Sequence, residues 1–197
     1  MDIDTIFLEF DDSFSLNISS NLYDCGVKHR LVKYNEVEEI KIKPTKNYQV
    51  IVGPGPGNPG DYPEVLNFLE KNLTRENIYF LGICLGHQLI SLVNGGELYY
   101  LGSPVHGQSF LLPKVRYFEK MGVNKVQYYN SIGVRENSLR KEIATVKDRG
   151  HIISTRGENF ITYQFHPESV GTDNSLNFYE PMLKWSREKI WGKNFLN

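Results

Sequence analysis

The first half of the chain alternates short apolar runs with amphipathic segments. The apolar runs predict strands at residues 5–10, 28–34, 48–52 and 79–83. Apolar residues at helical spacing predict helices at residues 14–25, 62–72 and 85–94. Strands that alternate with helices are joined by right-handed crossovers and lie parallel in one sheet. The pattern therefore predicts an α/β fold with an open, mainly parallel sheet flanked by helices.

The second half has shorter apolar stretches that are separated by polar or glycine breaks. These stretches predict strands at residues 96–101, 108–118, 124–129, 142–148, 151–156 and 160–165. We expect them to add a smaller antiparallel β portion. A closing helix is predicted at residues 173–191, with Asp173 or Asn174 as its cap and Pro181 as a kink or restart. The chain has no internal repeat, low-complexity tract or linker, so we expect residues 1–197 to form a single domain.

Composition and charge narrow the class of protein. A chain of 197 residues is long enough to bury a hydrophobic core without stabilising cross-links such as disulfides. Its formal net charge of -1 argues against a polyanion or an anionic membrane as the main partner. The two cysteines, Cys25 and Cys84, have no paired spacing, which gives little support to a disulfide framework or a zinc site. The N-terminus lacks the pattern of a signal peptide, and no apolar run approaches membrane-spanning length. We expect a soluble cytoplasmic protein with no metal and with no nucleic-acid or membrane partner.

Cys84 stands at the junction between a predicted strand and a predicted helix, with Gly82 and Gly86 on either side. Glycines flank the nucleophile of strand–turn–helix elbows in this way, because the tight turn leaves no room for larger side chains. Such a corner would direct the side chain out of the fold, and the positive end of the following helix would favour thiolate over thiol. The alternative is a small, buried apolar cysteine. The stretch by itself leaves both interpretations open.

The segment GPGPGNPG at residues 53–60 follows another predicted strand. Ligands of an open parallel sheet bind outside the carboxyl ends of its strands, where this segment and Cys84 are both expected. One interpretation of the segment is a rigid surface turn. Beside a nucleophile, the backbone N–H groups of Gly55 and Gly57 would also suit an oxyanion site.

His166 and Glu168 follow the last predicted strand, two positions apart. An imidazole could take the proton of a thiol and return it to a leaving amine, while a carboxylate holds the ring in one tautomer. A lone histidine is more often structural or exposed. We assign the other histidines mainly to that class: His29, His87, His106 and His151. His166 is therefore the candidate partner of Cys84.

Three motifs occur in register along the chain: GPGPGNPG at residues 53–60, GICLGHQ at 82–88 and FHPES at 165–169. In this order and spacing they resemble the class I, or triad, glutamine amidotransferases, which have a flavodoxin-like fold. The resemblance points to the small (glutaminase) subunit, component II, of anthranilate synthase and aminodeoxychorismate synthase. The likeness extends over nearly the whole chain and includes residues 12–17, 106–109 and 128–132.

The resemblance implies a role for each matching residue. Cys84 corresponds to the nucleophile, His166 to the general base and acid, and Glu168 to the carboxylate that orients the imidazole. The other matches correspond to contacts with glutamine or its oxyanion: Gly55, Pro56, Gly57, the amide of Leu85, Gln88, and the backbone of Ser131 and Ile132. The implied reaction hydrolyses L-glutamine to glutamate and ammonia through a covalent glutamyl thioester.

The family also implies a partner. Its ammonia acceptor is chorismate, which binds to a separate synthase subunit, component I, that makes anthranilate or 4-amino-4-deoxychorismate. No chorismate-binding domain fits within 197 residues, so we expect this chain to be one subunit of a heteromer in tryptophan or folate synthesis. The resemblance implies no cofactor in this chain and a Mg²⁺ requirement in the partner synthase subunit.

Four positions depart from the usual family pattern: Glu9, Phe10, Gln108 and Asn130. Two other functions therefore stay open. A stand-alone γ-glutamyl hydrolase would have the same chemistry without ammonia transfer, although the GPGPGNPG loop argues against it. A non-catalytic regulatory subunit would have a drifted site, although the intact set of Cys84, His166 and Glu168 argues against that.

Overall fold

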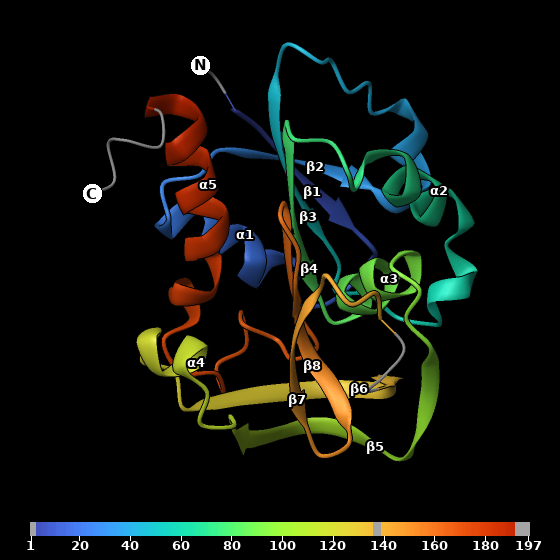
Figure 1. Ribbon diagram of the computed structural model, residues 1–197, viewed down its shortest axis with the longest axis vertical. Coiled ribbons are helices and arrows are strands. Elements are labelled where there is room, and N and C mark those ends of the chain that lie inside the picture. The colour runs from blue at the N-terminus through green and yellow to red at the C-terminus, as the bar shows by residue number, and fades with distance from the viewer. Residues whose placement is uncertain (1–2, 136–138, 192–197) are drawn as a thin grey trace.

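The computed structural model describes residues 3–135 and 139–191. Its strands form one mixed, nine-stranded sheet in the order β2-β1-β3-β4-β9-β8-β6-β5, with β7 paired to β8. Figure 1 shows this sheet between helices on both faces. The strands are β1 (Ile3–Glu9), β2 (His29–Lys33), β3 (Asn47–Val52), β4 (Ile78–Ile83), β5 (Leu98–Leu111), β6 (Lys125–Arg135), β7 (Ala144–Asp148), β8 (His151–Arg156) and β9 (Phe160–Tyr163).

The parallel half of the sheet has the expected architecture. Strands β2, β1, β3, β4 and β9 pair in parallel in that order, which is the flavodoxin-like arrangement. The predicted helices of this half are all present. They are α1 (Ser15–Asp24), α2 (Pro63–Asn72) and α3 (Leu85–Val93), with the short 3-10 helices η1 (Tyr34–Glu39) and η2 (Pro59–Asp61) in the connections. The prediction of an open, mainly parallel sheet flanked by helices is confirmed.

The antiparallel half corrects the prediction in its first two strands, because β6 also continues to Arg135, beyond the expected end at residue 129. The two strands expected at residues 96–101 and 108–118 are one long strand, β5, which pairs with β6 through two register shifts. The glycines that resembled strand ends lie instead at bulges within this strand. One of the bulges is at Gly107, which has a φ of 67°. The strand ends at Leu111 because Pro113 cannot donate a ladder hydrogen bond. The end of the expected strand is instead the short helix α4 (Arg116–Lys120).

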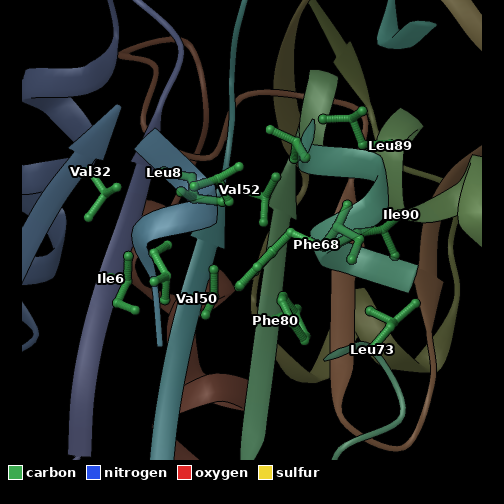
Figure 2. Packing of buried hydrophobic residues seen from close by; sticks show 14 of the residues in the cluster. Ile6, Leu8, Val32, Val50, Val52, Phe68, Leu73, Phe80, Leu89 and Ile90 are labelled. Atoms are coloured by element: carbon green, nitrogen blue, oxygen red, sulfur yellow. The ribbon is translucent and has the colours of Figure 1, made fainter. Parts of the chain in front are cut away.

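Apolar side chains cover both faces of β1, β3 and β4, which explains why these strands are rich in apolar residues. Ile6 and Leu8 pack on the face covered by α2 and α3. Phe7, between them, packs on the opposite face with Ile18 of α1 and Met182 near the C-terminus. Figure 2 shows the first of these clusters, in which strand side chains point toward the α2–α3 layer.

The C-terminal segment restarts at the predicted proline. The 3-10 helix η3 (Ser175–Tyr179) is followed by α5 (Glu180–Trp191), whose second residue is Pro181. Pro181 is tolerated there because the first turn of a helix has no internal partner for its N–H groups. Asn174 occupies the cap position of η3 with a φ of 47° but makes no capping hydrogen bond with its side chain. Among the described residues, no helix combines the length and the apolar character that spanning a lipid bilayer requires.

Helix α3 lies unusually close to strand β3. A Cβ atom at Gly86 would be 1.9 Å from the carbonyl oxygen of Val52, and both are backbone positions that cannot move independently. We predict that Gly86→Ala lowers the free energy of unfolding by about 1–3 kcal/mol or more, because overpacking must push α3 away from the sheet. Urea unfolding curves measure the change.

The matched control is Gly102→Ala, because a Cβ atom at Gly102 would meet nothing within 4 Å. We expect this variant to stay within about 0.5 kcal/mol of the wild type. Equal unfolding midpoints for the Gly86→Ala variant and the control would contradict the predicted clash.

Candidate active site

Cys84 forms a sharp corner between β4 and α3. Its φ of 50° and ψ of -99° are rare for a residue with a side chain. The corner is held by hydrogen bonds, because the Cys84 N–H donates to the carbonyl oxygen of Tyr163 at 2.8 Å and the Gln88 N–H donates to that of Cys84 at 3.2 Å. A Cβ atom at Gly82 would lie 2.7 Å from the carbonyl oxygen of Gly86. The expected glycine-flanked turn is therefore present.

The Cys84 side chain does not project into solvent as the turn alone suggested. The residue is 6% exposed, because residues from the end of β9 cover the corner. Gln164, which is fully buried, points its Nε2 atom toward the sulfur at 3.8 Å. The thiol is thus buried: Cys84 belongs to the same apolar cluster as Phe7 and Ile18, and the amide of Gln164 faces its sulfur.

His166 and Glu168 form a buried pair. Nδ1 of His166 lies 2.6 Å from Oε1 of Glu168, and the two residues are 2% and 5% exposed. The short contact fits a ring whose Nδ1–H donates to the carboxylate. Nε2 of His166 has no hydrogen-bond partner among the described residues. The ring nitrogen opposite the carboxylate is therefore buried but not engaged in a hydrogen bond within the described residues.

The electrostatics of the pair favour a charged imidazole. Burial lowers the pKa of His166, but the nearby Cys84 and Glu168 outweigh this effect, and the pKa of His166 is raised well above its ordinary value. The sulfur of Cys84 thus lies close enough to His166 to affect its protonation. The structure brings together the three residues singled out from the sequence.

Two aromatic rings hold the imidazole in place. Phe14 and Tyr129 each lie 5.0 Å from His166, measured between ring centroids. The Asn17 side chain of α1 also donates to the carbonyl oxygen of Glu168 at 3.3 Å. None of these contacts was predicted from the sequence, because each joins the His166–Glu168 segment to a residue more than 30 positions away in the chain.

The glycine–proline loop packs directly against the corner. A Cβ atom at Gly53 would lie 2.6 Å from the carbonyl oxygen of Ile83, and one at Gly55 would lie 2.6 Å from a methyl group of Leu85. Pro56 and Gly57 are exposed, and the carbonyl oxygen of Pro56 accepts a hydrogen bond from Tyr62 at 2.7 Å. The loop is therefore placed beside the candidate nucleophile, as expected.

Gln88 and Ile132 are also brought together, on the other side of α3. Nε2 of Gln88 donates to the carbonyl oxygen of Ile132 at 3.0 Å, and the Asn130 amide donates to the same oxygen at 2.9 Å. Ser131, between Asn130 and Ile132, is exposed. A carbonyl oxygen has two lone pairs, so a substrate that used the oxygen of Ile132 would have to displace one of these donors.

Gln164 is a site residue that the sequence reasoning missed. Its Oε1 accepts a hydrogen bond from Gln88 at 3.3 Å, while its Nε2 faces the sulfur of Cys84. The available signal was its position two residues before His166, since alternate residues of an extended segment share a face. A second signal was the presence of a polar glutamine at the end of an otherwise apolar strand.

The four residues that depart from the usual family pattern lie in different parts of the structure. Oε1 of Glu9 accepts hydrogen bonds from the N–H of Asp12 and the hydroxyl of Ser15, so it stabilises the turn after β1. Phe10 packs in the core against Tyr34 and Tyr62. Two others remain: Gln108 is exposed on β5, and Asn130 is buried with no partner for its Oδ1 atom in the part of the chain that the structure describes.

Comparison with known proteins decides the family. The family model described as "Glutamine amidotransferase class-I" matches residues 6–183, which include the corner, the loop and the histidine–glutamate pair. The chain belongs to the class I glutamine amidotransferases. The resemblance drawn from the three motifs is confirmed.

Individual relatives of this amidotransferase agree with the branch inferred from the motifs. A Haemophilus influenzae protein provisionally named anthranilate synthase component II is 33% identical over 172 residues, which cover 82% of this chain and 86% of the relative. A phenazine-specific anthranilate synthase from Pseudomonas fluorescens is 31% identical over 147 residues, which cover 68% of this chain and 22% of that longer protein. A Thermotoga maritima glutamine amidotransferase of known structure has a TM-score of 0.67 at 17% identity, covering 95% of this chain and 85% of that one.

A cavity of about 840 Å³ lies at the other end of the amidotransferase sheet, near the start of β4 and β9. Its lining includes Phe160, Trp185 and Lys189 but no cysteine or histidine. Parallel sheets bind ligands at the carboxyl ends of their strands, so this cavity is not the candidate active site. In the described residues, no group of three or more His, Cys, Asp or Glu side chains is arranged to hold a metal ion.

His87 anchors the first turn of α3 of this amidotransferase to the sheet. Nε2 of His87 lies 3.2 Å from the carbonyl oxygen of Ile152, which can only accept, so this nitrogen carries the proton. Nδ1 then accepts from the hydroxyl of Thr162 at 2.7 Å, and Thr162 contacts the hydroxyl of Thr155. Burial lowers the pKa of His87 to about 3. The structural role predicted for this histidine fits its surroundings.

The depressed pKa of His87 predicts a pH dependence of stability. The unfolded chain binds a proton at His87 below about pH 6.5 while the folded protein does not, so stability is lost as pH falls from there toward 3. Between pH 7 and pH 5 we expect the wild type to lose about 2 kcal/mol more than the His87→Met variant. Urea unfolding of both proteins at the two pH values measures this difference. Parallel losses in the two proteins would contradict a neutral, buried His87.

Proposed function

We propose that this chain is the glutaminase subunit of a chorismate-using synthase and that it hydrolyses L-glutamine to glutamate and ammonia. The observation that carries the proposal is the meeting of three features at one corner of the sheet. They are a cysteine in a rare backbone conformation, a buried imidazole–carboxylate pair with a free Nε2 atom, and a glycine-rich loop packed on the same turn. This combination suits nucleophilic attack on a carboxamide.

In the proposed first step, the Cys84 thiolate attacks the side-chain carbonyl carbon of glutamine and a C–S bond forms. The carbonyl oxygen becomes an oxyanion, which the backbone N–H groups of Leu85 and of the loop at Gly55–Gly57 would stabilise. Each well-placed donor of this kind is worth about 2.7–4 kcal/mol of barrier in comparable sites. His166 then gives its proton to the amide nitrogen as the C–N bond breaks, and ammonia leaves.

In the second step, His166 takes a proton from water as the water oxygen attacks the glutamyl thioester. The C–S bond breaks, and glutamate and the Cys84 thiolate are released. Glu168 keeps the ring oriented and stabilises its cation throughout, in line with the raised pKa of His166. All of these steps use only side chains and backbone groups of this chain together with glutamine and water.

The amino-acid end of glutamine would bind near Gln88, Ser131 and Ile132. Ser131 is the exposed member of this group, so a ligand can approach the site at this position. The occupied carbonyl oxygen of Ile132 favours binding through N–H groups at this position. Asn130 offers an additional buried acceptor in its Oδ1 atom, which has no hydrogen-bond partner among the described residues.

The proposed partner is a chorismate-binding synthase subunit, which would use the ammonia to make anthranilate or 4-amino-4-deoxychorismate. Two relatives support this choice, one through its name as a component II and the other because it joins a matching segment to a much longer synthase. These names favour a synthase subunit over a stand-alone γ-glutamyl hydrolase. We also propose that residues 1–197 form one amidotransferase domain, in keeping with the single mixed sheet.

Replacing the nucleophile separates ammonia production from ammonia use. In a complex with a chorismate-binding synthase subunit, we predict that Cys84→Ser lowers glutamine-dependent product formation by at least about 1,000-fold, because a hydroxyl is a far weaker nucleophile. Synthesis from added ammonium should stay at the wild-type rate. The matched control is Cys25→Ser, which changes the other, half-buried cysteine and should retain both activities. Equal loss of both activities in the Cys84→Ser variant would assign Cys84 to folding or assembly.

The histidine and glutamate should contribute unequally. We predict that His166→Ala abolishes measurable glutamine hydrolysis, whereas Glu168→Gln slows it and leaves at least about tenfold more activity than His166→Ala. The reason is that a positioned imidazole still transfers protons when its neighbour loses charge. Glutamate release measured for the two variants gives the order. Near-normal turnover by the His166→Ala variant would require a different general base.

A further inference from the structure

Gln127 of β6 lies where the segment that carries His166 and Glu168 crosses back over the sheet. Its backbone forms an isolated antiparallel bridge with His166, and its carbonyl oxygen accepts a hydrogen bond from the His166 N–H at 2.9 Å. Its own N–H donates to the hydroxyl oxygen of Thr172 at 3.0 Å, and that hydroxyl donates to the carbonyl oxygen of His166 at 2.7 Å. The backbone of Gln127 thus holds both ends of residues 166–172.

The side-chain amide of Gln127 adds a second set of bonds to the same segment. Its Oε1 accepts hydrogen bonds from the Gly171 N–H, at 3.1 Å, and from the Ser169 hydroxyl. Its Nε2 donates to the carbonyl oxygen of Gly107 at 2.9 Å, at the bulge of β5. One half-buried side chain therefore joins the catalytic segment to the edge strand of the sheet.

The fit around this amide is close. A Cβ atom at Gly171 would lie 2.5 Å from Oε1 of Gln127 and 2.7 Å from the hydroxyl oxygen of Ser109. The Ser109 hydroxyl itself donates to the carbonyl oxygen of Gly171 at 3.2 Å. Because side chains from two neighbouring strands converge on one glycine, the segment has little freedom to shift while these bonds last.

Rings make a second connection between the same two regions. His106, which precedes the bulge, lies 5.1 Å from Tyr129, and Tyr129 lies 5.0 Å from His166, measured between ring centroids. Tyr129 is two residues beyond Gln127 on β6, so both side chains belong to the same face of the strand. The position of the imidazole therefore depends on how β6 and the β5 bulge are arranged.

We propose that Gln127 is a positioning residue, whose amide fixes residues 166–172 on β6 and β5 and so keeps the His166–Glu168 pair in register with Cys84. This proposal rests on the proposed function of these three residues. Gln127 contacts neither Cys84 nor the residues proposed to bind glutamine in any hydrogen bond of the described chain. Its loss should therefore affect the chemical step and leave substrate affinity unchanged.

The test replaces Gln127 by methionine, which keeps the length of the side chain and removes the donor and the acceptor. We expect kcat for glutamine hydrolysis to fall about 10- to 100-fold, because small misplacements of a catalytic group have effects of this size. KM should stay within about twofold. The rate of alkylation of Cys84 by iodoacetamide, followed by mass mapping, should fall in parallel, since the imidazole no longer supports the thiolate.

The matched control is Lys125→Met, on the same strand. Lys125 makes an exposed ion pair, 4.0 Å long, with Asp173, the residue that follows residues 166–172, and such pairs contribute little. The control should keep the wild-type kcat, KM and alkylation rate.

A second variant, Ser169→Ala, removes one donor to the Gln127 amide and should lower kcat by a smaller factor than Gln127→Met does. Combined with Gln127→Met it should add nothing further.

Several outcomes would overturn the proposal. They are an unchanged kcat and alkylation rate in Gln127→Met, a rise of KM at constant kcat, or an equal loss in Lys125→Met. If circular dichroism shows that Gln127→Met is unfolded, Ser169→Ala decides, and an unchanged kcat in that folded variant counts against the proposal. Alkylation of Cys84 requires no glutamine. If the wild type hydrolyses no glutamine, the proposed function is rejected. The positioning role is retained in that case if Cys84 is alkylated more slowly in the Gln127→Met variant than in the wild type.

Discussion

The contact between the first turn of α3 and the end of β3 determines how the corner at Cys84 is built. At Gly86 the helix backbone approaches the carbonyl oxygen of Val52 so closely that no side chain fits. This approach forces the chain to leave β4 through a single residue, Cys84, in a conformation that costs about 1–3 kcal/mol. The cost is tolerated because buried strands, the hydrogen bond to Tyr163 and the α3 helix determine the position of Cys84 from several sides.

The same contact arranges the surroundings of the sulfur. With α3 seated on β3, the loop that follows β3 lies against Leu85 and Gly86. Alternate side chains from Thr162 of β9 onward then meet the helix in sequence. Thr162 binds His87, and Gln164 binds Gln88 and faces Cys84, while the next alternate residue, His166, lies near the sulfur and pairs with Glu168. Because an extended segment presents every second side chain to one face, one row of polar residues serves the helix, the thiol and the carboxylate.

The prediction of this fold from sequence was successful where the determining interactions are local. The apolar runs at β1, β3 and β4 are buried on both faces, and their order along the chain sufficed to predict a parallel sheet. It was wrong at β5, where glycines resembled strand ends. Whether a glycine ends a strand or forms a bulge depends on the partner strand, here β6, which continues the pairing across the breaks.

The glycine-flanked turn at Cys84, the spacing of His166 and Glu168, and the family were predictable from the sequence. Each depends on residues a few positions apart or on motifs in fixed order. Three contacts were established only by the folded structure: Gln164 faces the sulfur, the carbonyl oxygen of Ile132 is already occupied, and Gln127 binds the segment beyond His166. These contacts join residues 40 or more positions apart. Their partners are selected by strand order and register, which arise only when the whole sheet is assembled.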